Sequence, residues 1–155
     1  MSSDYIRKEV EKIIKDEKLA FPKNLAMASA WLLGNLKGLN LKIYDVQGKS
    51  ALADYFVIAS ATNTTQAHAM SESIMKYMSK FGYRTKSCEG QNDADWILLD
   101  LGDIIVHIFL ENSRPIYDLD NLWADSENIE IPASYYFKTP DTETTKKESS
   151  DKDYF

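Results

Sequence analysis

The sequence has few of the residues on which many functional sites depend. It contains one cysteine, Cys88, and two histidines in 155 residues. A lone cysteine forms neither a disulfide framework nor a cysteine-based zinc site, and few cysteines are typical of a reducing compartment. No apolar run approaches the roughly 20 residues that span a bilayer, and the charged start MSSDYIRKEV lacks the apolar core of a signal peptide. These absences predict a cytoplasmic protein without a membrane anchor.

The usual motifs of nucleotide and metal chemistry are missing as well. No P-loop and no GxGxxG motif occurs, so no cofactor is predicted. His107 and Glu111 lie four residues apart, but no third ligand is spaced to complete a metal site. The aromatic residues around His107 lie among acids rather than among Lys and Arg, which argues against direct nucleic-acid readout.

What the sequence does contain is enough apolar residues for one core and a marked asymmetry of charge. Hydrophobic residues make up 44% of the chain, whose length suits one globular domain. Residues 89–131 hold eleven acids and one cation, Arg114, giving −10, whereas the rest of the chain carries +4. A field of one sign repels nucleic acid and attracts a basic partner. The alternative interpretation is a solubilising surface.

Hydrophobic periodicity predicts an α/β domain with a single mixed β-sheet of about five strands packed with helices. Apolar residues at helical spacing predict helices at 24–37, 64–81 and 117–123. Alternating or apolar runs predict strands at 39–46, 52–61, 83–90, 96–101 and 104–109. Asn63 and Gln66 have the spacing of a helix N-cap and its third helical residue, which marks the start of the second helix.

The two ends of the chain are predicted to be peripheral. Residues 1–22 carry Ile6, Val10, Ile13 and Ile14 near helical spacing among charged residues, which predicts a charged, helical N-terminal extension. Residues 23–131 form the predicted domain. Residues 132–155 have low apolar content and mixed charges, and they are predicted to form a flexible C-terminal tail whose first residues, PASYYF, are candidates for docking.

The segment DADWILLDLGDIIVHIF, residues 93–109, predicts a hairpin with two different faces. Gly102 and Asp103 suit a two-residue turn, which fixes the register of the two strands. One face is apolar and is predicted to be core: Ile97, Leu99, Leu101, Ile104, Val106 and Ile108. The other face is mixed: Trp96, Leu98, Asp100, Ile105, His107 and Phe109.

Asp100 and His107 lie diagonally across this hairpin, within reach of a hydrogen bond. We predict that they form a structural polar pair, and that the carboxylate raises the pKa of His107 above its ordinary value of about 6.5. The alternative is a nucleotidyltransferase-like or hydrolytic enzyme that uses Asp100, Asp103 and His107. No serine in a nucleophile-elbow pattern accompanies them, so no catalytic residue is assigned.

Aromatic residues and Arg inside the acidic segment favour recognition of a protein, because these types dominate interface hot spots. The predicted partner-binding residues are Asp95, Trp96, Leu98, Phe109, Arg114 and Tyr117. Trp123 forms a helical stripe with Leu119 and Leu122, so it is predicted to anchor the last helix to the sheet. A further alternative is a homodimeric scaffold that pairs through an exposed sheet edge.

The run DADWILLDLGDIIVHIFLENSRPIYDLDNLW resembles the ribosomal silencing factors, also called the Iojap-like family. The residues that carry the resemblance are Asp95, Trp96, Asp100, Gly102, Asp103, His107, Ile108, Phe109, Arg114, Tyr117, Leu119, Leu122 and Trp123. Upstream, DYFVIASATNTTQ is similar to the family's second-strand segment, and the likeness spans residues 25–131. Asp120 stands where the family usually has Glu, and Asn112 and Ser113 stand where a Pro-Glu pair is common.

The resemblance implies a function without catalysis. Members of the family bind large-subunit ribosomal protein fourteen on the face that meets the small subunit, and they block subunit joining. Their fold is similar to that of nucleotidyltransferases, but the Gly-Ser and paired-Asp signature of those enzymes is absent here. The acidic segment would meet a basic ribosomal protein with complementary charge.

Overall fold

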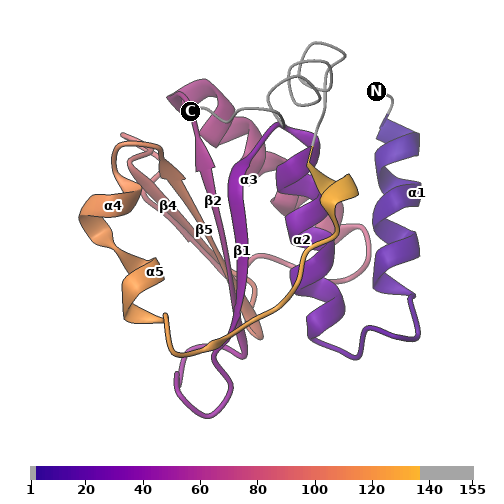
Figure 1. Cartoon of the computed structure of the whole chain (residues 1–155). Helices are drawn as coiled ribbons and strands as arrows, with labels where there is room; N and C mark the ends of the chain where they lie inside the picture. The colour runs from indigo at the N-terminus through magenta and orange to yellow at the C-terminus, as the bar shows by residue number, and fades with distance from the viewer. Residues whose placement is uncertain (1–2, 137–155) are drawn as a thin grey trace, which may run out of the picture.

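A computed structural model describes residues 3–136 of the chain (Figure 1). Its helices are α1 (Ser3–Ile14), α2 (Lys23–Asn35), α3 (Thr64–Ser79), α4 (Arg114–Tyr117) and α5 (Leu119–Leu122), with a 3-10 turn η1 (Ala133–Tyr135). Its strands are β1 (Leu39–Asp45), β2 (Tyr55–Ala61), β3 (Ser87–Glu89), β4 (Trp96–Asp100), β5 (Ile104–Leu110) and β6 (Glu127–Asn128). The predicted α/β class is confirmed.

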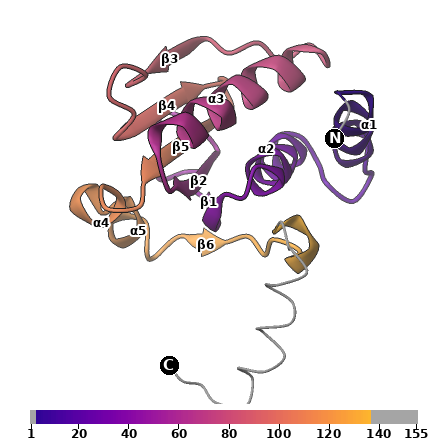
Figure 2. The ribbon, with the colours of Figure 1, turned by 90° about the horizontal axis from the view of Figure 1, so that it is seen from above.

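The strands form one mixed sheet in the order β3-β4-β5-β2-β1-β6. Strands β2 and β5 run parallel, and the other neighbours run antiparallel. The sheet therefore has six strands where the sequence predicted about five, because the two-residue β6 pairs with the end of β1. Helices α2 and α3 cover one side of the sheet with α1 outside α2, and α4 and α5 lie on the other side (Figures 1 and 2).

The predicted register of the hairpin is confirmed. Trp96 lies opposite Phe109 and Leu98 opposite His107. Gly102 has a φ of 96°, a conformation that glycine adopts without strain. All six residues of the apolar face are buried in the larger core, between the sheet and α2 and α3. A register shift by one residue would have exchanged the two faces, so the apolar pattern and the turn together specify this packing.

The mixed face of the hairpin belongs to a second, smaller core between the sheet and α4 and α5. Its buried members are Tyr44, Val46, Ala53, Phe56, Ile58, Ile105, Phe109 and Leu119. Trp96, Leu98 and Trp123 are half-buried and pack against them. The face predicted to meet a partner is therefore largely covered by the chain itself.

The C-terminal helix predicted at 117–123 is divided in two. Asp118 adopts a left-handed conformation with a φ of 54°, which separates α4 from α5. Leu119 and Trp123 face the sheet, as predicted, but Leu122 is 70% exposed and does not share their stripe. A helix of one turn buries only one side, and Leu119 and Trp123, four residues apart, occupy that side, which leaves Leu122 on the exposed side.

The ends of the chain are partly described. The predicted N-terminal helix is confirmed as α1, in which Val10 is fully buried against α2. The backbone N–H of Leu41 donates to the hydroxyl of Tyr136 at 2.9 Å, so the start of the predicted tail docks on β1. Residues 137–155 of that tail lie outside the described residues, and the boundaries at 22 and 131 stay predictions. Within residues 3–136, no helix is both long and apolar enough to cross a membrane.

Candidate functional site

Aromatic side chains gather where β4 and β5 meet α4. The ring of Trp96 lies 4.8 Å from that of Tyr117 and 5.1 Å from that of Phe109, measured between centroids. Phe109 is fully buried, Trp96 is half-buried and Tyr117 is 48% exposed. The cluster therefore has a buried base and an exposed rim, and the rim is made by Trp96 and Tyr117.

His107 holds Trp96 in place instead of pairing with Asp100. The indole N–H of Trp96 donates to Nδ1 of His107 at 3.0 Å. Asp100 turns the other way, and its carboxylate accepts from the backbone N–H of Gly102 at 2.8 Å. The predicted Asp100–His107 pair is thus wrong, because the turn offers the carboxylate a donor only two residues away.

The predicted rise in the pKa of His107 is wrong for the same reason. Burial lowers the pKa of His107 to about 4, since the charged imidazolium would lose its hydration. A donor on Nδ1 also favours the neutral ring. His107 is therefore neutral at pH 7, and Asp103 lies exposed at the turn. The three residues of the alternative enzyme do not form a hydrogen-bonded set.

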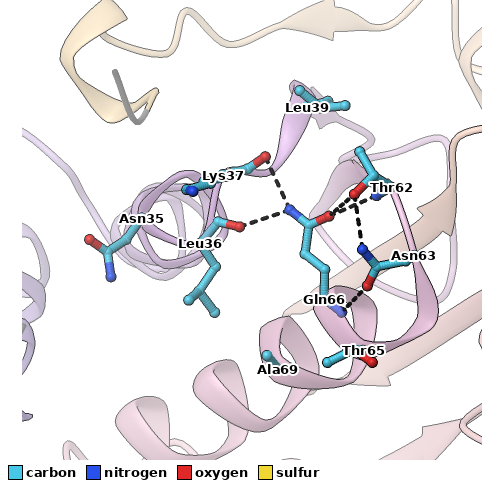
Figure 3. A pocket seen from close by; sticks show the side chains of 9 residues that line it. All are labelled: Asn35, Leu36, Lys37, Leu39, Thr62, Asn63, Thr65, Gln66 and Ala69. Carbon is cyan, nitrogen blue, oxygen red and sulfur yellow. Dashed lines mark hydrogen bonds between the residues drawn. The ribbon is translucent and has the colours of Figure 1, made fainter. Parts of the chain in front are cut away.

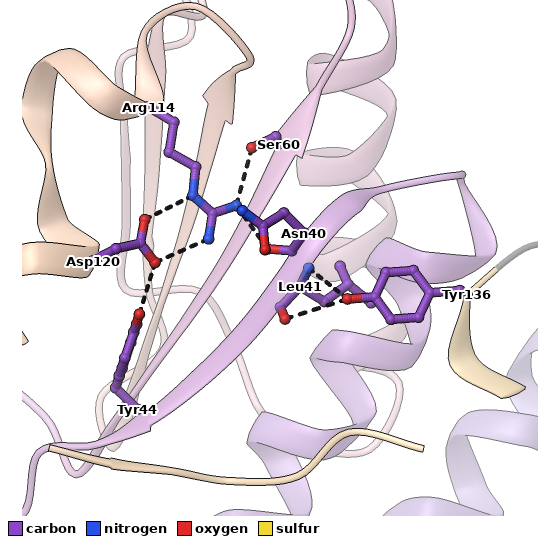
Figure 4. A network of polar contacts seen from close by, with 7 residues as sticks. All are labelled: Asn40, Leu41, Tyr44, Ser60, Arg114, Asp120 and Tyr136. Atoms are coloured by element: carbon purple, nitrogen blue, oxygen red, sulfur yellow. Dashed lines mark hydrogen bonds and ion pairs between the residues drawn. The ribbon is translucent and has the colours of Figure 1, made fainter. Parts of the chain in front are cut away.

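Arg114 is the centre of a buried polar network (Figure 4). Its Nε and Nη2 donate to the two carboxylate oxygens of Asp120 at 2.9 and 3.1 Å. Its Nη1 donates to the carbonyl oxygen of Asn40 at 2.7 Å and to the hydroxyl of Ser60 at 3.0 Å. The guanidinium thus ties α4 and α5 to strands β1 and β2.

This network shifts the pKa of two of its members. The guanidinium of Arg114 holds the pKa of Asp120 below its ordinary value, helped by the hydroxyl of Tyr44, which donates to Asp120 at 2.7 Å. Burial raises the pKa of Tyr44, and the neighbouring carboxylate adds to the rise. Both groups therefore keep their ordinary ionisation at pH 7, and Asp120 stays charged beside Arg114.

Two of the predicted partner-binding residues are not available to a partner. Arg114 is 5% exposed and Phe109 is 0% exposed. Assigning them to direct contact is wrong, because the donors of Arg114 are engaged within the protein and Phe109 lies under Trp96. Asp95 and Tyr117 are exposed, and Trp96 and Leu98 are half-buried, so these four stay candidates.

Sequence reasoning left Ile116 unassigned and placed Leu122 in the stripe that faces the sheet, but both side chains are exposed. Ile116 is 76% exposed and Leu122 is 70% exposed. Their exposure depends on the break at Asp118, which no apolar period reveals. We define the α4–α5 surface as Asp95, Trp96, Ile116, Tyr117 and Leu122. Exposed acids lie along the same stretch of chain: Glu111, Asp118 and Asp125.

A pocket of about 640 Å³ lies elsewhere, between the end of α2 and the start of α3 (Figure 3). The backbone N–H of Gln66 donates to the side chain of Asn63 at 2.8 Å, which confirms the predicted N-cap. The side-chain amide of Gln66 donates to the carbonyl oxygens of Leu36 and Lys37 and accepts from the backbone N–H of Thr62. Gln66 is therefore a joint between two helices, and its polar groups are occupied.

Metal ligands do not gather in the described part of the chain. Among residues 3–136, no group of three or more His, Cys, Asp or Glu is arranged to hold a metal ion. His68 contacts the carbonyl oxygen of Gln91 through Nε2 at 2.6 Å, which occupies the second histidine as well.

Comparisons with known proteins agree on one family. The model described as "Ribosomal silencing factor during starvation" matches residues 20–154, which leaves α1 outside the match. Ribosomal silencing factors from Haemophilus influenzae and Bacillus subtilis are 41% and 32% identical over 92 and 104 residues. These matches cover 59% and 67% of this chain, and 90% and 88% of the relatives.

A eukaryotic relative and a solved structure extend the comparison. The mouse protein named mitochondrial assembly of ribosomal large subunit protein 1 is 30% identical over 95 residues, which cover 59% of this chain and 42% of that protein. A crystal structure of a protein from Bacillus halodurans is 29% identical with a TM-score of 0.58. That match covers 69% of this chain and 94% of the solved chain.

Proposed function

Because the chain belongs to the family of ribosomal silencing factors, we propose that it binds the large ribosomal subunit and prevents the small subunit from joining. The proposed partner is large-subunit ribosomal protein fourteen, on the intersubunit face. The mechanism is steric: a bound domain occupies a surface that the small subunit needs, and translation is repressed without a chemical step. The bacterial relatives support the cytoplasm as the place of action.

The α4–α5 surface is the observation that carries this proposal. It presents exposed apolar side chains within a segment of net charge −10, residues 89–131. The one cation of that segment, Arg114, is buried and bound to Asp120. Exposed charge in this segment is therefore all of one sign, which suits a basic protein such as those of the ribosome.

The two kinds of residue contribute differently to binding. Burying a side chain of the size of Ile116 or Leu122 in an interface yields roughly 1.5–3 kcal/mol. Exposed acids such as Asp95 act mainly on the rate of encounter, and salt screens them over about 10 Å at 0.1 M. Affinity should therefore reside in the apolar residues, and the dependence of the association rate on salt should reside in the acids.

The alternative of a homodimer stays a prediction. Strand β3 lies at one edge of the sheet and could accept a strand from a second copy, but it is three residues long. A short edge strand is a poor template for pairing.

Binding to purified large subunits tests the proposal with a matched control. Ile116→Ser and Leu122→Ser each remove an exposed apolar side chain from the α4–α5 surface. Leu52, which is 71% exposed in the loop between β1 and β2, provides the control Leu52→Ser. All three variants should unfold like the wild type, since none is packed in a core.

Co-sedimentation with large subunits should separate the three variants. We expect Ile116→Ser and Leu122→Ser to weaken binding about tenfold or more each, because the roughly 1.5–3 kcal/mol from burying the apolar side chain is lost. Leu52→Ser should change it by less than about twofold, as exposed side chains away from an interface do. Equal weakening by all three, or no weakening by the first two, would show that the α4–α5 surface is not the binding site.

A further inference from the structure

Two aromatic side chains that are distant in sequence stack on the surface of the protein. Phe21 lies in the loop between α1 and α2, and Tyr83 follows α3. Their ring centroids are 6.1 Å apart and their planes differ by 26°. Phe21 is 54% exposed although its ring is large and apolar. The pair therefore offers an open aromatic platform, formed only when the chain folds.

Cations lie close in sequence to both rings of this platform. Residues 16–23 and 73–88, which carry Phe21 and Tyr83, hold six Lys or Arg and two acids, a net charge of +4 in a chain of net charge −6. Lys18, Lys80 and Arg84 are exposed and Lys23 is partly exposed. We define the Phe21–Tyr83 patch by its rings and these cations: Lys18, Phe21, Lys23, Lys80, Tyr83 and Arg84.

These four cations differ from those of the neighbouring helix. Within residues 3–136, none of the four makes an ion pair, whereas Arg7, Lys8 and Lys12 of α1 and Lys15 just after it are each paired with an acid of α1. Their charge is therefore not neutralised locally. In Figure 1, the loop from α1 to α2, which carries Phe21, lies on the opposite side of the molecule from α4 and α5, so the patch and the α4–α5 surface do not compete for space.

We propose that the Phe21–Tyr83 patch binds single-stranded RNA. Lysine and arginine would contact the phosphates, and the aromatic pair would stack a base, which is the combination that single-strand binders use. A single strand is favoured over a duplex, because bases in a duplex already stack on each other. An acidic peptide can bind the cations without supplying a planar group for the rings, whereas every base of a single strand has one.

Such binding carries little sequence information. Phosphate contacts and stacking position a strand without reading base edges, so the patch agrees with the absence of base readout predicted from the sequence. The repulsion of nucleic acid expected from the acidic segment applies to residues 89–131. The acids carried by α4 and α5 lie on the other side of the sheet from α3, which precedes Tyr83.

The test is fluorescence anisotropy of the full chain with a labelled oligouridylate of about 20 nucleotides. Four phosphate contacts predict a slope of about −3 for the logarithm of the binding constant against the logarithm of salt concentration. Affinity should then fall about 50-fold between 50 and 200 mM salt. The result does not depend on ribosomal subunits, so it can fail independently of the proposed function.

Two variants and one control locate the site. Lys80→Ala with Arg84→Ala should reduce the slope by about 1.4, because two contacts are lost. Phe21→Ser should weaken binding about tenfold with the slope unchanged, because stacking is insensitive to salt. As the control, Lys42→Ala with Lys49→Ala also removes two positive charges, one in β1 and one after it. This variant should leave the salt slope and the affinity unchanged.

Several results would overturn the inference. One is the absence of RNA binding at 50 mM salt. Another is a reduction of the salt slope in the Lys42 and Lys49 control as large as the reduction in the Lys80 and Arg84 variant. Binding of phosphatidylserine vesicles without binding of RNA would assign the cations to a membrane instead. Equal affinity for duplex RNA, with no effect of Phe21→Ser, would remove the role of the aromatic platform.

Discussion

Replacing Arg114 should detach the C-terminal helices from the sheet. Arg114→Ala removes the hydrogen bonds to Asp120, Asn40 and Ser60 and leaves a carboxylate without its cation. Truncating one member of a buried ion pair costs about 3–5 kcal/mol. The side chain of Asp120 is 32% exposed, so water can solvate part of its charge. We therefore expect the free energy of unfolding to fall by about 3 kcal/mol, at the lower end of that range.

The loss should be greatest in one region of the protein. Helices α4 and α5 have four residues each, far fewer than the roughly 12–15 that sustain an isolated helix. Urea unfolding measures the total loss of stability. Relative to the wild type, hydrogen exchange should speed up more in residues 114–123 than in β2 or β5. Arg114→Lys keeps the charge without the planar fork, and it should recover part of the stability.

The opposite outcome would restore the interpretation based on sequence. If Arg114→Ala loses binding to large subunits while its free energy of unfolding changes by less than about 0.5 kcal/mol, the range of an ordinary surface substitution, Arg114 contacts the partner directly. The packing described here would then be wrong for the bound state.

Three further changes test other parts of the structure. Because the pKa of His107 is lowered to about 4 by burial, the unfolded chain takes up the proton first, so stability should be complete above about pH 6.5 and fall by on the order of 3 kcal/mol towards pH 4. An NMR titration of His107 with a midpoint above pH 6.5 would contradict this. Gln66→Ala removes the joint between α2 and α3 and should lower the free energy of unfolding by about 2 kcal/mol in a urea titration; an unchanged midpoint would show that the joint is dispensable. Gly34→Ala places a methyl group against the backbone of Tyr135, so it should lower stability by about 1–3 kcal/mol and speed proteolysis near η1, and unchanged proteolysis would contradict that contact.

The sequence predicted those parts of the structure that depend on local periodicity. Alternation of apolar residues and a Gly-Asp turn are enough to place Leu99 opposite Val106 and to assign the two faces of the hairpin. The N-cap at Asn63 depends on a contact three residues away, which is equally local. The break at Asp118 and the two-residue β6 were missed, because neither has a period that identifies it.

Site residues were harder to predict, because residue type does not reveal the partner of a side chain. Arg114 has the composition of a hot spot, but its acceptors come from β1, β2 and α5 and are brought together only by folding. Asp100 could reach His107 on the predicted sheet, but in the structure its carboxylate accepts a hydrogen bond from the nearer N–H of Gly102 instead. The stacking of Phe21 on Tyr83 is likewise visible only in the folded chain.

Subunit joining is the most direct measurement of the proposed function. Separated subunits are mixed with the purified protein, joining is started with magnesium, and the products are resolved in a sucrose gradient. Protein added before joining should keep the subunits apart, and protein added afterwards should do much less, since its site would be covered. Ile116→Ser combined with Leu122→Ser should restore joining, while Leu52→Ser should inhibit as the wild type does. Unchanged joining at saturating protein, or binding to the small subunit instead, would contradict the account.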